Sequence, residues 1–107
     1  MKIQIETNIP DNVIKKIKEK IDKNEIKTWK YDNEGDFYYI VEQYAAEYKN
    51  NGICVRPSIQ NDSLQFLIAC HKGKSISRET CGIEFGRFIE MLITHFSDSI
   101  TKIIIVL

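Results

Sequence analysis

The stretch Glu79–Phe96, ETCGIEFGRFIEMLITHF, decides the fold that we predict for this chain. Its apolar side chains recur every three or four residues, which on a helix gives one broad apolar stripe. We therefore expect the core helix here, with Arg87 paired to Glu84 or Glu90. The predicted solvent face carries Glu84, Arg87, Glu90 and Thr94. The stripe consists of Cys81, Phe85, Phe88, Ile89, Leu92, Ile93 and Phe96.

Two glycines and a serine refine the picture of this helix. Gly82 and Gly86 lie one turn apart at the margin of the stripe. Their missing side chains would let a strand or helix backbone approach closely, so we expect such a neighbour there. Ser77 precedes the helix and is placed to cap its first turn.

The rest of the chain is predicted to form strands and two further helices. An amphipathic helix follows Pro10, and a short extended piece at 36–39 leads into a helix that ends near Asn50. Pro57 cannot donate to a ladder, which pushes its strand toward an edge or a bulge. The β-branched run Thr101–Leu107 suits a central strand buried on both faces. The other predicted strands are Lys2–Glu6, Ile26–Tyr31, Ile53–Ile59 and Leu64–Cys70.

Together these elements predict an α+β fold. We expect a two-layer sandwich, in which a mixed, mostly antiparallel sheet of about five strands carries two main helices on one face. The length of 107 residues fits a single globular domain spanning 1–107.

Composition narrows the classes of function. The 15 basic and 15 acidic residues cancel, so the whole chain has no field that would draw it to nucleic acid or to a membrane. No apolar run has the length of a signal peptide or a membrane span, which favours a cytoplasmic protein. A homodimer is compatible with the sequence.

The cysteines and histidines favour neither a metal nor a cofactor. Cys54, Cys70 and Cys81 form no C-x-x-C pair and stand among apolar neighbours, so we expect buried free thiols in a reducing compartment. His71 and His95 are not spaced to complete a zinc site with these cysteines. We therefore expect no metal ligand set and no cofactor.

No catalytic residues are predicted, because no nucleophile signature and no metalloprotease motif occurs. The most suggestive short string is His71-Lys72-Gly73-Lys74-Ser75, a basic turn between a strand and a helix. It does not match a P-loop, since Ile68 stands where the first glycine should be. As a looser site for phosphate, another anion or nucleic acid, it provides the alternative hypothesis. The candidate anion-binding residues are His71, Lys72, Lys74 and Arg78.

The middle of the chain carries the preferred functional hypothesis. Seven aromatic residues lie between Trp29 and Tyr48, and from Tyr31 to Asn50 five acids stand against one base, Lys49. Aromatic rings supply contact area and acids steer a basic partner, so this composition is typical of a binding surface. We therefore expect a non-catalytic interaction domain of the inhibitor, immunity or adaptor type. The candidate partner-binding residues are Tyr31, Asp32, Glu34, Asp36, Tyr38, Tyr39 and Glu47.

Overall fold

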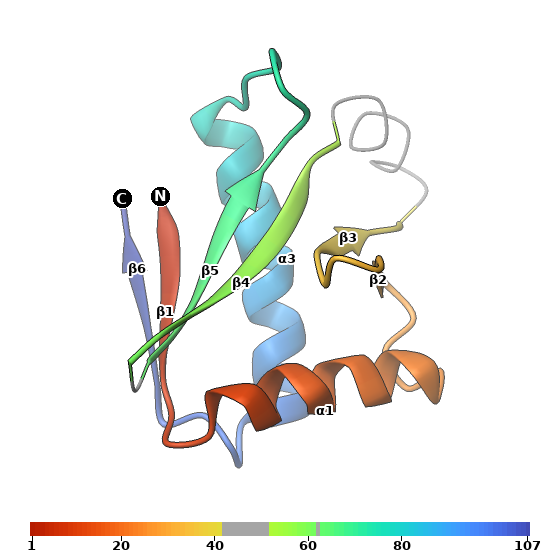
Figure 1. The fold of residues 1–107 in the computed structure, drawn as a ribbon, viewed down its shortest axis with the longest axis vertical. Helices are drawn as coiled ribbons and strands as arrows, with labels where there is room; N and C mark the ends of the chain where they lie inside the picture. Colours follow the sequence, from red (N-terminus) through yellow and green to blue (C-terminus); the bar gives the residue numbers. More distant parts are fainter. Residues whose placement is uncertain (42–51, 62) are drawn as a thin grey trace.

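The computed structural model describes residues 1–41, 52–61 and 63–107. In this part of the chain, two helices accompany one antiparallel sheet of six strands, so the predicted α+β class is confirmed with one more strand than expected (Figure 1). In chain order the elements are β1 (Lys2–Glu6), α1 (Pro10–Asp22), β2 (Trp29–Tyr31), β3 (Phe37–Tyr39), β4 (Cys54–Gln60), β5 (Ser63–Ala69), α3 (Arg78–Phe96) and β6 (Lys102–Val106).

The sheet has the strand order β2-β3-β4-β5-β1-β6, and all five pairings between neighbouring strands are antiparallel. β4 and β5 pair as the hairpin that the sequence predicted, but the hairpin lies at the centre of the sheet, so β4 is not the edge strand that Pro57 suggested. Pro57 is tolerated within β4 because β3 pairs with β4 only at Phe37 and Val55, which leaves the β3 side of Pro57 free of that ladder.

One hydrophobic core joins the sheet to both helices. In Figure 1, α3 runs behind the sheet and α1 crosses its lower end. Phe88 of α3 lies at the centre, with ring centroids 4.6 Å from Phe66, 5.1 Å from Trp29 and 6.0 Å from Phe37. The buried side chains of α1 that enter the same core are Val13, Ile17 and Ile21.

The predicted core helix is confirmed, but its buried face is rotated from the expected stripe. Ser77 caps α3, since its hydroxyl accepts the Thr80 N–H at 3.1 Å. Phe85, Phe88, Leu92 and Phe96 are buried as predicted, whereas Ile93 is 58% exposed. Burial continues instead toward Met91 and Glu84, so the assignment of Glu84 to the solvent face was wrong. Arg87 contacts Glu90 at 3.1 Å, as expected.

Two other local predictions were wrong. The run at the end of the chain forms β6 at one end of the sheet, not a central strand, and Ile105 is 53% exposed. A buried central strand and a partly exposed edge strand can share the same β-branched composition, so the sequence did not separate them. A Cβ placed on Gly82 or Gly86 would meet no atom within 4 Å beyond the neighbouring helix backbone, so no other element among the described residues approaches these glycines closely.

The ambiguous stretch after the Asp32–Asp36 turn is extended where the structure describes it. Phe37–Tyr39 forms β3, in agreement with the short extended piece predicted at 36–39. The helix predicted to end near Asn50 lies outside the described residues, apart from its first positions.

Candidate functional site

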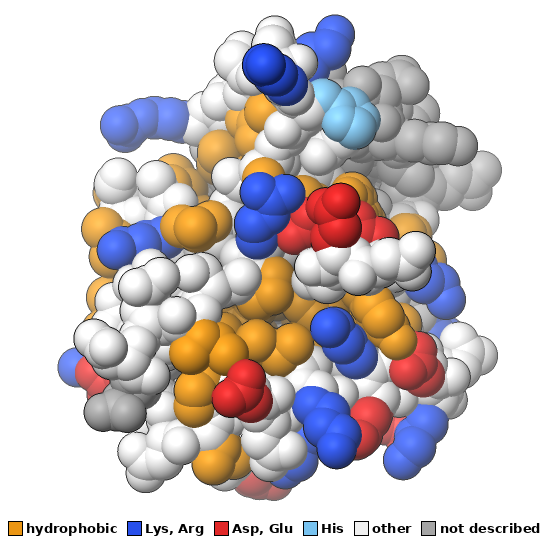
Figure 2. Space-filling view, viewed as in Figure 1, with side chains coloured by type: hydrophobic (Ala, Val, Ile, Leu, Met, Phe, Trp, Pro, Cys, Tyr) orange, Lys and Arg blue, Asp and Glu red, His pale blue; other side chains and the backbone are white. Residues whose placement is uncertain are grey.

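A hollow of about 430 Å³ opens on the face of the sheet opposite α3. In the β4–β5 ladder, Val55 points toward the core, so Cys54 and Arg56 on either side of it point to the other face. Ala69 of β5 lies opposite Cys54 and points the same way. In Figure 2 acidic side chains gather beside a basic one on this face, and a histidine lies beyond them. The lining residues are Asp32, Asn33, Glu34, Asp36, Tyr38, Gly52, Cys54, Arg56, Ala69, Cys70 and His71.

A tight turn between β2 and β3 supplies most of the acidic wall. The Asp32 carboxylate accepts the N–H groups of Glu34 and Asp36, both at 3.0 Å, and the Tyr38 hydroxyl at 3.0 Å. Gly35 completes the turn with φ of 85°, a conformation that costs glycine little. Burial raises the pKa of Asp32, but these hydrogen bonds outweigh it, so the net pKa lies below its ordinary value. Asp32 is therefore ionised at neutral pH.

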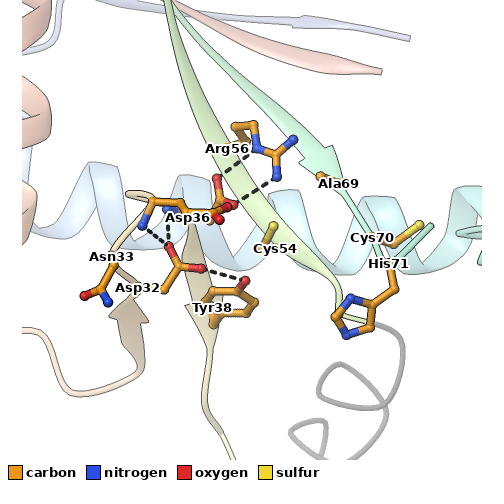
Figure 3. A pocket seen from close by; sticks show the side chains of 11 residues that line it. Asp32, Asn33, Asp36, Tyr38, Cys54, Arg56, Ala69, Cys70 and His71 are labelled. Atoms are coloured by element: carbon orange, nitrogen blue, oxygen red, sulfur yellow. Dashed lines mark hydrogen bonds and ion pairs between the residues drawn. The ribbon is translucent and has the colours of Figure 1, made fainter.

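Asp36 contributes a second carboxylate that is almost covered by protein. Its exposed fraction is 3%, and Arg56 of β4 donates to its two oxygens at 2.9 and 3.0 Å (Figure 3). This two-pronged pair raises the pKa of Arg56 further above its ordinary value, chiefly through the hydrogen bond to Asp36. The pair fixes the turn to the centre of the sheet.

Two potentially reactive groups in the hollow are protonated at neutral pH. Burial, with a smaller contribution from Asp36, raises the pKa of Cys54 to about 11. Burial and the hydrogen bond to Asp32 likewise raise the pKa of Tyr38. A thiol of this kind is a poor nucleophile, since only the thiolate attacks. The hollow therefore offers binding groups more readily than a nucleophile.

His71 lines the opposite end of the hollow from Asp32 and Asp36 (Figure 3). Its ring lies directly against Gly52, because a Cβ added there would come within 2.5 Å of three ring atoms. Gly52 also has φ of 65°, so backbone conformation and ring contact both favour glycine at this position.

The thiols only partly follow the sequence prediction. Cys54 is buried as expected, whereas Cys70 and Cys81 are half-buried. Cys70 directly follows β5, and its thiol donates to the Lys74 carbonyl at 3.2 Å. Burial raises the pKa of Cys81, which keeps that thiol protonated at neutral pH.

A divalent metal fits the acidic turn poorly. One oxygen from each of Asp32, Glu34 and Asp36 lies within 4.8 Å of the others, an arrangement that exposed acids often adopt without a metal. The two oxygens of Asp36 already contact Arg56, and those of Asp32 accept three hydrogen bonds. A cation there would compete with the guanidinium for the same carboxylate.

Of the other three predicted partner-binding residues, Tyr31, Tyr39 and Glu47, the first two do not line the hollow. The Tyr31 hydroxyl donates to Asp22 at 2.7 Å, outside the hollow, and Lys18 lies over its ring. That hydrogen bond is the main reason why the pKa of Tyr31 is raised. Tyr39 belongs to the core, where its ring packs against Trp29. Glu47 lies outside the described residues.

The predicted anion-binding loop does not gather into one site. Only His71 lines the hollow, while Lys72, Lys74 and Arg78 are exposed around the turn at Gly73. The amino end of α3 is already capped by its own serine and has an acid in its first turn. The Ser77 hydroxyl already accepts one of the N–H groups that an anion would contact, and the negative charge of Glu79 disfavours a second anion there.

Arg56 and Cys54 are the site residues that the sequence reasoning missed. Both alternate with core residues along β4, and no local motif marks them. Arg56 becomes part of the site only because β3 and β4 pair, which sets it beside an acid 20 positions earlier.

Neither helix in the described part of the chain is long and apolar enough to cross a membrane. Comparisons of this chain with models of protein families, with curated proteins and with solved structures find no match.

Proposed function

We propose that this protein is a non-catalytic interaction domain, of the inhibitor, immunity or adaptor type, that binds a basic protein partner through the hollow. A lysine or arginine side chain of the partner would enter between the acidic turn and the histidine end. The observation that carries the proposal is the charge of the hollow: three carboxylates face one guanidinium, which leaves two excess negative charges.

The chemistry of the individual groups supports a cation as the bound group. Asp32 is held ionised by its hydrogen bonds, and Glu34 is exposed at the rim. Tyr38, half-buried between them and the sheet, offers an aromatic surface beside the carboxylates. Lys18 lies against the turn on the Gly35 side, outside the lining of the hollow. Acidic surfaces of this kind accelerate association with basic partners.

Charge reversal at Glu34 tests the proposal, because this side chain is exposed and its loss leaves the turn intact. Asp36 is unsuitable, since a lysine there would face Arg56. Glu34→Lys should weaken capture of a basic partner by slowing association, by roughly tenfold at low salt, and the loss should shrink as salt rises. The matched control is Glu25→Lys, which changes the net charge equally at another exposed position.

Two readouts make the result decisive. Amide chemical shifts, followed while a short lysine-rich peptide is added, should move for residues 32–38 and for Arg56 in the natural chain but not in Glu34→Lys. Proteins captured from the native lysate should be lost with Glu34→Lys and retained with Glu25→Lys. Equal losses in both variants would contradict the hollow as the binding surface. Loss only after reversal of Lys72, Lys74 and Arg78 would support the anion-binding alternative instead.

A further inference from the structure

Strand β6 leaves one end of the sheet open. Within residues 1–41, 52–61 and 63–107, only β1 pairs with it, so its outer edge presents free backbone donors and acceptors. Natural proteins usually protect such an edge with several charges, a proline or a bulge. The five residues Lys102–Val106 contain a single charged side chain and no proline.

The surface beside this edge is also apolar. Ile105 is 53% exposed, Val106 42% and Ile93 of α3 58%. A groove lined in part by Leu92, Ile93 and Ile103 connects the helix to the strand. The spacing of Gly82, Gly86 and Ile93 places both uncovered glycines on the same flank of α3. The groove and the open helix flank continue the edge on the α3 side of the sheet, to which Ile103 and Ile105 point, whereas Val106 points to the opposite face.

We propose that β6 pairs in antiparallel fashion with β6 of a second copy of this chain, about a two-fold axis at Ile104. The sheet would then run without interruption through both copies. In this register Ile103 lies opposite Ile105 of the second copy, and Lys102 lies opposite Val106. Residues that face each other across such a pair point to the same side of the sheet, so the α3 layers of the two copies lie on the same side of the joined sheet.

The charges of β6 select this arrangement. The antiparallel register keeps the two Lys102 side chains at opposite ends of the ladder, about 14 Å apart along the strands. A parallel pairing in register would place them side by side, which is unfavourable. The antiparallel arrangement is also self-complementary, so it closes at two copies and leaves no β6 edge exposed, while the sheet ends at β2 in each copy.

The size of the surface predicts a weak dimer. A five-residue strand is about 17 Å long, and a standard stable interface takes about 800 Å² from each partner, with 20 to 30 residues a side. One strand and one helix flank supply less than this. We therefore expect a dissociation constant in the micromolar range, typical of small interfaces.

Sedimentation of the full chain from about 1 to 500 µM, a range that brackets such a constant, tests the proposal. The natural chain should pass from monomer to dimer within the range. Val106→Lys should weaken the dimer at least about fivefold, because it sets two lysines opposite each other at both ends. Val106→Glu should keep or strengthen it, since glutamate meets Lys102 of the second copy. Both variants remove the same apolar contact, so their difference reports the register.

One double variant separates the effect of the second copy from that of Lys2, which lies opposite Val106 within one chain. Val106→Glu combined with Lys102→Glu keeps the contact to Lys2 but sets glutamates opposite each other across the axis, so dimerisation should fall again. Circular dichroism of each variant checks that the monomer is folded. Glu34→Lys, far from β6, should leave the dimer unchanged.

Several results would overturn the proposal. The natural chain could sediment as a monomer at every concentration, or it could form species larger than a dimer. Equal weakening by Val106→Lys and Val106→Glu would show that the register is wrong. Weakening by Glu34→Lys would place the contact at the hollow instead.

Discussion

The two faces of the sheet are held by different physics. On the inner face, three aromatic rings have centroids 4.6 to 6.0 Å from the ring centroid of Phe88. This packing is stabilised mainly by removal of apolar area from water. On the outer face, Arg56 contacts Asp36 at 2.9 Å, and Tyr38 donates to Asp32 at 3.0 Å. The inner face depends on which residues are apolar, whereas the outer face depends on which strands become neighbours.

The largest expected difference lies within α3 itself. Phe88→Ala should lower the free energy of unfolding by about 3 to 5 kcal/mol, because it removes a buried ring and leaves a cavity. Ile93→Ala, from the same predicted stripe, should cost less than about 0.5 kcal/mol, since that side chain is largely exposed. Urea denaturation at a concentration where the chain is monomeric measures both. Similar losses for the two variants would contradict the observed rotation of the buried face.

Periodicity predicted the fold because it reports burial. The stripe of α3, the alternation in β1 and β5, and the α+β class all follow from where apolar residues recur. Periodicity predicts burial less well at the margin of an apolar stripe and at the edge of a sheet. Glu84 occupies a buried position at the margin of the stripe, and β6 resembles a central strand although it lies at the edge. Composition alone does not tell an edge strand from an interior one.

A smaller effect is expected at the ion pair of the outer face. Arg56→Ala removes both donors from the almost fully buried carboxylate of Asp36, which should cost about 1 to 3 kcal/mol. Lys102→Ala is the matched control, because Lys102 and Glu6 are both exposed and lie 4.0 Å apart. That pair should be worth less than about 1 kcal/mol. Urea denaturation at low protein concentration compares them, and equal costs would mean that the burial of Asp36 adds nothing.

The candidate site was only partly predictable, for the same reason. The acids and Tyr38 were found because they are close together in the sequence. Arg56, Cys54 and His71 join them only through the pairing of β3 with β4 and of β4 with β5. Such pairings are non-local, and no residue pattern within one strand encodes its neighbour. Tyr39 shows the converse error, since its aromatic character suited a surface equally well as a core.

The smallest expected effect is a pH dependence of the free energy of unfolding. It tests whether the charge of Asp32 stabilises the turn. Because hydrogen bonds hold the pKa of Asp32 below its ordinary value, its ionised form stabilises the fold. This contribution is complete above the pKa of Asp32 in the unfolded chain, about 3.9, and is lost as the pH falls through the lower folded-state pKa.

Asp32→Asn lacks the titration but keeps an oxygen that can accept the same backbone N–H groups. The stability gap between the natural chain and Asp32→Asn, measured by urea denaturation, should therefore be widest near pH 7 and narrow below pH of about 4. Glu25→Gln, at an exposed position, should show a gap that stays small throughout. A gap for Asp32→Asn that is constant with pH would mean that the turn is held by backbone geometry alone, and that the charge on Asp32 is free to serve the binding of a partner.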